Sequence, residues 1–236
     1  MKFAIIAAGE GSRLLSGGVK TPKPLVCPNG ETLIDRLIRI FLANQAESIS
    51  IIVNRQMLVV YEHLCSLRLS VPLHITYKST LSSMHSFYEL SSTLEGGKFC
   101  LTTVDTIFKE DEFARYIEAF DQSEADGLLA VTDYIDDEKP LYVETDGQMM
   151  ICGFHDVVFP GACFVSGGVY CLRQNSLPIL KKSVEAGMQK MRNYQRQLIK
   201  SGLRLQAYPF SKIIDIDRQE DILKAKDFLN EQNKIR

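Results

Sequence analysis

The stretch Met1–Leu25, MKFAIIAAGEGSRLLSGGVKTPKPL, decides the fold that the sequence predicts. Its apolar run Phe3–Ala8 is short, continuous and free of charge, which predicts a strand buried on both faces of a parallel sheet. The run leads directly into Gly9-Glu10-Gly11-Ser12-Arg13, where two glycines allow backbone angles that other residues resist. A lysine held between two prolines follows in Pro22-Lys23-Pro24. Together, the strand, glycine turn, arginine and stiffly mounted lysine predict a polyphosphate site.

The overall composition is that of a soluble globular protein. The chain has 236 residues, of which 45% are hydrophobic and 24% charged, and we predict one domain over residues 1–236. A net charge of −2 argues against general nucleic-acid binding, and no apolar stretch approaches the roughly 20 residues of a membrane span. The N-terminus lacks a cleavable signal pattern, and the six cysteines contain no CxxC pair. A reducing cytoplasm is the expected location.

Beyond the opening loop, strand patterns alternate with amphipathic helical patterns. We predict strands over 49–53, 74–77, 99–104 and 127–132, and helices over 32–42, 57–68, 82–94 and 110–120. Thr32 or Asn29 could cap the first of these helices. This alternation predicts βαβ units and a mainly parallel sheet.

The second half of the chain changes character. Asp146-Gly147 between two short apolar runs predicts a β-hairpin over 141–152. A strand over 165–172 follows, then helices over 176–186 and 189–201, short strands over 204–208 and 213–216, and a last helix over 218–229. The predicted fold class is therefore a Rossmann-like three-layer α/β/α arrangement with a mainly parallel mixed sheet and a small antiparallel insertion.

The opening loop has the means to hold phosphate groups. Backbone N–H groups from Ala8 to Arg13 can point at phosphate oxygens, Arg13 offers a forked donor, and Lys23 offers a point charge. A dinucleotide-binding loop would need a third glycine where Leu14 stands, and no GK[ST] triplet of a Walker loop occurs. The structural alternative is an ordinary glycine-rich βα turn.

AAGEGSRL followed by KTPKPL resembles the N-terminal signature of the sugar-nucleotide pyrophosphorylases, the GT-A-like nucleotidyltransferases. The resemblance implies a GT-A-like fold and a reaction in which a phosphate monoester attacks the α-phosphorus of an NTP and pyrophosphate leaves. It implies catalytic roles for Arg13 and Lys23. It also implies that the nucleotide is bound at Ala7, Ala8, Gly9, Glu10, Gly11, Ser12, Arg13 and Lys23.

Two aspartates are the candidate ligands of a divalent metal, which we expect to be Mg²⁺. Asp105 ends an apolar strand, at the point where ligand groups sit in open α/β sheets, although Val104 stands where the family has glycine. The resemblance to the family implies that Asp217, just before the last predicted helix, is the second metal ligand. As an alternative, Asp217-x-x-Glu220 is a capping box for that helix. Asp215 lies on the same strand face as Asp217 and is the backup ligand.

Further resemblances concern the nucleobase and the acceptor. Ser82, Ser83 and Met84 fall where related enzymes contact the base, and the pattern weakly favours CTP over UTP or dTTP; a helix N-cap at Ser82 or Ser83 is the alternative. The predicted substrate-binding residues on the acceptor side are Gly168, Tyr170 and Lys212, with a β-bulge as the alternative role of Gly168. Glu138-Lys139-Pro140 matches a triplet that touches the sugar in sugar enzymes, but it precedes the hairpin instead of following it. We therefore interpret that match as accidental.

The sequence thus predicts an Mg²⁺-dependent nucleotidyltransferase that uses an NTP (CTP, or UTP or dTTP) and a phosphorylated sugar or alcohol. One alternative is a cytidylyltransferase for a phospho-alcohol such as phosphocholine or inositol phosphate. Another is a catalytically silent nucleotide-binding module of the same fold. Neither a nucleic acid nor a membrane is an expected partner. The sequence is compatible with a homo-oligomer but does not decide the oligomeric state.

Overall fold

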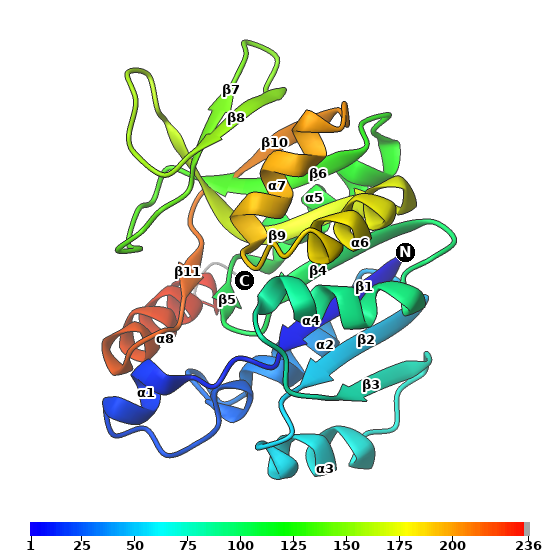
Figure 1. Ribbon diagram of the computed structural model, residues 1–236. Coiled ribbons are helices and arrows are strands. Elements are labelled where there is room, and N and C mark those ends of the chain that lie inside the picture. The colour runs from blue at the N-terminus through cyan, green and yellow to red at the C-terminus, as the bar shows by residue number, and fades with distance from the viewer. Residues whose placement is uncertain (234–236) are drawn as a thin grey trace.

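A mixed β-sheet forms the centre of the computed structural model, which describes residues 1–233 (Figure 1). Its main strands follow the order β10-β6-β9-β4-β1-β2-β3. Their bounds are β1 (Lys2–Ala7), β2 (Ser48–Val53), β3 (Leu73–Tyr77), β4 (Lys98–Thr103), β6 (Gly127–Thr132), β9 (Phe164–Arg173) and β10 (Leu205–Phe210). All neighbouring pairs are parallel except those of β9, which runs antiparallel to both β4 and β6.

Helices cover both faces of this sheet, which gives three layers (Figure 1). One face packs against α2 (Leu33–Ala43), α3 (Leu58–Ser66), α5 (Glu110–Gln122) and α8 (Gln219–Asn233). The other face packs against α4 (Ser83–Leu90), α6 (Leu177–Glu185) and α7 (Met191–Lys200). Three short 3₁₀ turns are η1 (Lys23–Leu25), η2 (Ser91–Thr93) and η3 (Gln174–Ser176), and α1 (Ser12–Ser16) follows β1 closely.

Strand β1 shows why the sequence folds in this way. Phe3, Ile5 and Ala7 pack into the core on one side of the sheet, whereas Ala4 and Ile6 pack into the core on the other. Successive side chains of a strand point to opposite faces, so a strand between two helical layers must be apolar throughout. The continuous apolar run in the sequence is the consequence of that position.

Two small antiparallel elements complete the fold. The hairpin β7 (Tyr142–Thr145) and β8 (Ile151–His155) adds to the end of β9, and β11 (Ile214–Asp215) pairs with β5 (Thr106–Ile107). The predicted fold class is confirmed, and Thr32 caps α2 by accepting a hydrogen bond from Asp35 N at 3.2 Å.

The predicted hairpin is present, but its turn is longer than Asp146-Gly147. Residues 146–150 separate the two strands, and Asp146 Oδ1 accepts hydrogen bonds from the N–H groups of Gln148 and Met150. Met149 takes a φ of +62° inside the loop. The aspartate side chain therefore organises a longer turn, because it offers the backbone donors an acceptor that a tight turn would not.

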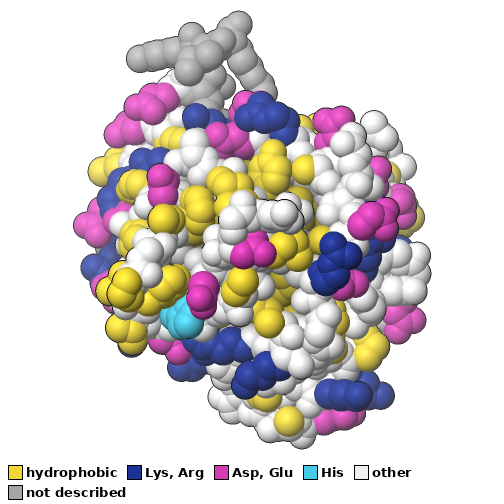
Figure 2. Space-filling view, turned by 90° about the horizontal axis from the view of Figure 1, so that it is seen from above, with side chains coloured by type: hydrophobic (Ala, Val, Ile, Leu, Met, Phe, Trp, Pro, Cys, Tyr) yellow, Lys and Arg dark blue, Asp and Glu magenta, His cyan; other side chains and the backbone are white. Residues whose placement is uncertain are grey.

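The described part of the chain, residues 1–233, contains no helix long and apolar enough to cross a membrane. Seen from above in Figure 2, acidic and basic side chains are interspersed with hydrophobic ones.

Candidate active site

The loop after β1 is shaped by Gly11. This residue precedes α1 with a φ of +63°, a left-handed conformation that glycine adopts without a steric penalty. In the described part of the chain, no backbone acceptor is paired with the N–H groups of Gly9, Glu10 and Gly11. Three adjacent donors are thus available to an anion at the carboxyl end of β1, as the sequence predicts.

Lys23 lies directly against this loop. A Cβ atom at Gly11 would be 3.3 Å from Lys23 Cβ, so the glycine is what permits the close approach. The 3₁₀ turn η1 begins at Lys23, after Pro22 and with Pro24 next in the chain, which stiffens the backbone that carries the lysine. Its side chain is only 10% exposed.

The Lys23 ammonium group binds two carboxylates. It forms a close ion pair with Asp105 Oδ2 and lies 2.9 Å from Asp217 Oδ1. Burial disfavours the charged amine, but the two carboxylates outweigh it and raise the pKa of Lys23 above its usual range. Lys23 is therefore a fixed positive charge at neutral pH.

Asp105 lies between β4 and β5, and its carboxylate is mostly enclosed. Its Oδ1 atom is buried and has no hydrogen-bond partner among the described residues. Burial opposes ionisation of this carboxyl, but the charge and hydrogen bond of Lys23 prevail and lower the pKa of Asp105. An ionised, buried oxygen without a donor is costly, so the site is suited to an added cation.

The short β5–β11 ladder brings the second aspartate to the first. Asp215 pairs with Thr106, and the N–H of Ile216 donates to the carbonyl of Asp105 at 3.1 Å. Asp217 follows immediately and reaches the same lysine. Enclosure by protein and the neighbouring carboxylate of Asp105 raise the pKa of Asp215, whose side chain nevertheless remains open to solvent on the cleft side.

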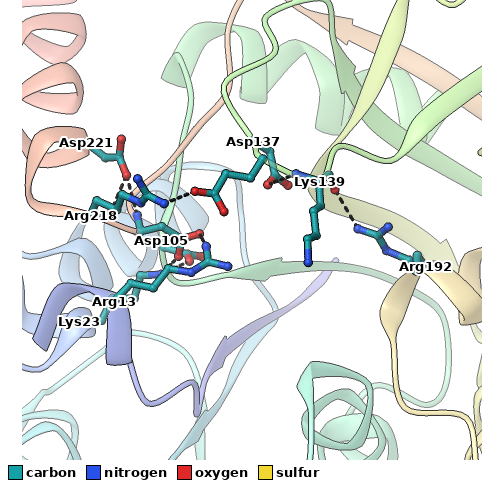
Figure 3. Close-up of polar contacts among 10 residues, drawn as sticks. Arg13, Lys23, Asp105, Asp137, Lys139, Arg192, Arg218 and Asp221 are labelled. Atoms are coloured by element: carbon teal, nitrogen blue, oxygen red, sulfur yellow. Dashed lines mark hydrogen bonds and ion pairs between the residues drawn. The ribbon is translucent and has the colours of Figure 1, made fainter. Parts of the chain in front are cut away.

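The last helix is capped by a residue other than the predicted pair. Asp221 Oδ2 accepts hydrogen bonds from the N–H groups of Asp217 at 3.1 Å and Arg218 at 2.8 Å. The carboxylate of Asp217 instead contacts two cations, Lys23 and Arg13, and the distance from Arg13 Nη1 to Asp217 Oδ2 is 2.6 Å. Figure 3 shows Arg13, Lys23 and Asp105 converging at this point.

A cleft of about 610 Å³ opens over the glycine loop. Among the predicted nucleotide-binding residues, it is lined by Ala8, Gly9, Glu10, Gly11, Ser12, Arg13, Lys23, Ser82 and Ser83. Asp105 and Asp217 also line it. We call it the nucleotide cleft. Ser82 also caps α4, accepting a hydrogen bond from His85 N at 3.4 Å, while its binding role stays a prediction.

Two predicted nucleotide-binding side chains lie elsewhere. Ala7 is 1% exposed and Met84 is fully buried, each in the hydrophobic core on one face of the sheet. Both are neighbours of cleft residues in the chain, but alternation along β1 and helical rotation in α4 turn their side chains inward.

A second, smaller cleft of about 130 Å³ adjoins the first, and the two share Arg13 and Asp217. We call it the acceptor cleft. Its other lining residues include Thr132, Tyr134, Ser166, Gly167 and Asp215, and the segment 136–138 with Pro140 closes one side. That segment is fastened across the cleft, because Glu138 pairs with Arg218 and Asp136 lies 2.7 Å from Lys224 Nζ.

The predicted acceptor residues Gly168, Tyr170 and Lys212 do not line this cleft. Tyr170 packs in the core, and Lys212 Nζ lies 4.2 Å from the centre of the Tyr134 ring. Gly168 has a φ of +74° within an irregularity of β9, so the bulge interpretation describes it. Ser166 and Gly167 of the same SGGVY stretch take the place at the cleft instead.

The Glu138-Lys139-Pro140 triplet is not among the predicted site residues, because its position before the hairpin favours an accidental match. In the structure Glu138 and Pro140 both line the acceptor cleft, and Lys139 O accepts a hydrogen bond from Arg192 at 2.9 Å (Figure 3). Chain order does not decide which loop reaches a cleft.

The carboxylates of the site suit Mg²⁺, although the protein would supply only a small part of its ligands. No group of three or more His, Cys, Asp or Glu side chains is arranged as a metal site among the described residues. Mg²⁺ commonly takes one or two carboxylates, and substrate phosphates and waters supply the rest. The unpartnered Oδ1 of Asp105 fits that requirement. The metal roles of Asp105 and Asp217 stay predictions.

Solved structures of nucleotidyltransferases share this fold. The inositol-1-phosphate CTP transferase from T. maritima is 19% identical, with a TM-score of 0.81 over 98% of this chain and 96% of its own. A putative glucose-1-phosphate thymidylyltransferase from Bacillus anthracis is 16% identical, with a TM-score of 0.84 over 97% and 94%. UDP-glucose pyrophosphorylase from Acinetobacter baumanii is 14% identical, with a TM-score of 0.79 over 100% and 99%.

A search of curated proteins finds no match. The family model described as the MobA-like NTP transferase domain matches residues 3–197, which include the glycine loop, Lys23 and Asp105. The match confirms the predicted nucleotidyltransferase activity, while the substrate stays open. This chain belongs to the MobA-like NTP transferase family.

Proposed function

We propose that the protein transfers a nucleoside monophosphate from an NTP to the phosphate of a hydroxyl-rich sugar or alcohol phosphate and releases pyrophosphate. One observation carries the proposal: a cleft over a phosphate-binding loop meets a second cleft at two shared residues, Arg13 and Asp217. Two substrates bound in the two clefts would have their phosphates side by side at that junction.

The nucleotide cleft would hold the triphosphate. The free N–H groups of residues 9–11, the Arg13 guanidinium and the fixed charge of Lys23 would bind its oxygens. An oxygen of the acceptor phosphate attacks the α-phosphorus, the bond from that phosphorus to the β-phosphate oxygen breaks, and pyrophosphate leaves. The attacking phosphate is already largely ionised at neutral pH, so the site needs no general base.

Mg²⁺ is the cofactor that we propose, with Asp105 and Asp217 as its protein ligands. Bound there, it would neutralise charge that gathers on the phosphates. Asp105 Oδ1 has no hydrogen-bond partner among the described residues, and the carboxylates of Asp105 and Asp217 both bind Lys23 Nζ. Lys23 would hold both carboxylates in place while donating to the substrate.

The nucleobase would lie near Ser82 and Ser83 at the start of α4. We propose a pyrimidine NTP, with CTP favoured over UTP or dTTP. Two supports are the serine-rich pattern of the sequence and the structural likeness to the T. maritima enzyme, whose name describes a CTP transferase.

The acceptor cleft favours a polyol or sugar phosphate over phosphocholine. Its carboxylates, among them Asp137 and Asp215, can accept hydrogen bonds from several hydroxyl groups. A quaternary ammonium group usually binds in a cage of several aromatic rings. Tyr134 is the one aromatic residue among the described residues that line this cleft, and Lys212 Nζ lies over its ring. A single ring does not form such a cage.

A panel of substrates tests the proposal. The four common NTPs are combined with inositol 1-phosphate, glucose 1-phosphate and phosphocholine in the presence of Mg²⁺, and released pyrophosphate is measured. We expect release with CTP and a hydroxyl-rich phosphate, and much less with phosphocholine. NTP binding in calorimetry without pyrophosphate release from any pair would instead identify a silent nucleotide-binding module. We further propose that residues 1–236 act as one cytoplasmic domain.

A further inference from the structure

Arg13 forms an ion pair with Asp217, one of the two proposed metal ligands. Its guanidinium group lies 2.6 Å from Asp217 Oδ2, while Lys23 Nζ lies 2.9 Å from Asp217 Oδ1. Both oxygens of Asp217 are therefore paired with cations. Asp105 differs, because only its Oδ2 is paired, with Lys23, and its buried Oδ1 has no partner among the described residues.

These contacts make the protein's metal site incomplete in the absence of nucleotide. A divalent cation beside Asp217 would face the positive charges of Arg13 and Lys23 within a few ångströms, where repulsion amounts to several RT. The charges of Arg13, Lys23, Asp105 and Asp217 also cancel, so these four groups together create no net attraction for a metal. Of the two proposed ligands, only Asp105 has a carboxylate oxygen without a partner among the described residues.

Only one of the two cations is free to leave. Lys23 is 10% exposed, stands on the 3₁₀ turn η1 between two prolines and also binds Asp105. The Arg13 side chain is 56% exposed, comes from the five-residue helix α1 and lines both clefts. The unpaired N–H groups of residues 9–11 lie beside it, so an arriving triphosphate competes for the guanidinium with Asp217.

We propose that Arg13 closes the metal site until a triphosphate binds: the guanidinium moves from Asp217 to the phosphates and releases a carboxylate oxygen to the metal. The inference rests on the proposed metal roles of Asp105 and Asp217. It gives Arg13 a second role, as a positioning residue that couples nucleotide arrival to assembly of the metal site. No bond other than the Arg13–Asp217 ion pair has to change for this exchange.

The test measures binding of Mn²⁺ to the protein without nucleotide, by the loss of the free-ion signal in electron paramagnetic resonance. Omitting nucleotide matters, because an NTP binds divalent metals itself. The variants are Arg13→Gln, Asp217→Asn, the double variant and Arg115→Gln. Arg115 is the matched control, because it is a similarly exposed arginine that pairs with Asp111 on α5, outside both clefts. Circular dichroism confirms that each variant is folded.

We expect Arg13→Gln to bind Mn²⁺ at least about tenfold more tightly than the wild type, since one opposing charge is removed beside the ligand. Adding Asp217→Asn should cancel the gain, and Arg115→Gln should match the wild type. Equal Mn²⁺ affinity of the wild type and Arg13→Gln would overturn the inference.

A second experiment tests separately whether Asp105 and Asp217 are metal ligands at all. Mn²⁺ binding is repeated with a non-hydrolysable NTP analogue, and a bound-metal signal of the ternary complex is compared among the wild type, Asp105→Asn and Asp217→Asn. If both asparagine variants keep the wild-type spectrum and affinity, the two aspartates are not the ligands. If the two asparagine variants lose the bound-metal signal, but Arg13→Gln binds Mn²⁺ no more tightly than the wild type without nucleotide, the metal ligands are right and only the proposed role of Arg13 is wrong.

Discussion

Arg13 and Asp217 lie 204 positions apart in the chain, yet Arg13 Nη1 is 2.6 Å from Asp217 Oδ2 where the two clefts meet. The contact depends on the β5–β11 ladder, which carries Asp217 back to the end of β4 and thus to the glycine loop. Because the same pair borders both clefts, changes at residues that touch only one cleft can separate nucleotide binding from acceptor binding.

Gly11→Ala should weaken NTP binding and destabilise the protein by about 1 kcal/mol, because an alanine resists the positive φ. Its Cβ would also press against Lys23 Cβ, 3.3 Å away, and displace the lysine from the phosphate site. Gly97→Ala is the control, because Gly97 lies outside the nucleotide cleft, a Cβ there meets no atom within 4 Å and its φ is not in the left-handed region. Equal NTP affinity of the two variants in calorimetry would contradict the role assigned to Gly11.

Glu138→Gln should raise the KM for the acceptor several-fold and leave the KM for the NTP nearly unchanged. Glu138 lines only the acceptor cleft and pairs with Arg218, so the change loosens the segment that closes that cleft. Asp111→Asn, at an exposed ion pair with Arg115 on α5, is the control and should change neither KM. A rise confined to the NTP would show that the two clefts are assigned the wrong way round.

Ser166→Ala and Tyr170→Phe test which part of the SGGVY stretch meets the acceptor. Ser166 lines the acceptor cleft and its Oγ accepts a hydrogen bond from Gln195 Nε2 at 3.0 Å, whereas Tyr170 is 9% exposed in the core. We expect Ser166→Ala to raise the acceptor KM, and Tyr170→Phe, which removes only a side-chain hydrogen bond to Ser166, to raise it less. The opposite result would restore Tyr170 as the substrate-binding residue that the sequence predicts.

Asp105→Asn should destabilise the protein at neutral pH by about 2 kcal/mol, because buried Lys23 loses a charged partner. The folded-state pKa of Asp105 is lowered below its unfolded value, so its stabilising effect is complete above the unfolded pKa of about 4. As the pH falls through the folded pKa, Asp105 becomes protonated and the effect is lost. Lys23, with a raised pKa, stays charged throughout.

Urea unfolding of the wild type and Asp105→Asn between pH 7 and pH 3 measures this. The stability difference should shrink below about pH 4, where Asp105 becomes protonated in the wild type. A difference that does not vary with pH would show that Asp105 is not ionised in the folded protein.

The sequence by itself determined the features that depend on local structure. The apolar run of β1, the two glycines and the lysine between prolines specify a buried strand and a phosphate loop within 25 residues. Strand and helix periodicity specified the layers, since each face of the sheet had to be covered by helices. Seven of the eight predicted loop and lysine residues, all except Ala7, accordingly line one cleft.

The acceptor side was decided only by tertiary structure. The resemblance of the SGGVY stretch implies that Gly168 and Tyr170 meet the acceptor, but an irregularity near Gly168 accompanies a different arrangement, with Ser166 and Gly167 at the cleft and Tyr170 in the core. Periodicity tells which residues share a face of a strand, and it does not tell where along the strand helices stop covering that face. For the same reason Glu138 and Asp217 reach the site through loops and a two-residue ladder, contacts between distant segments that only the folded chain creates.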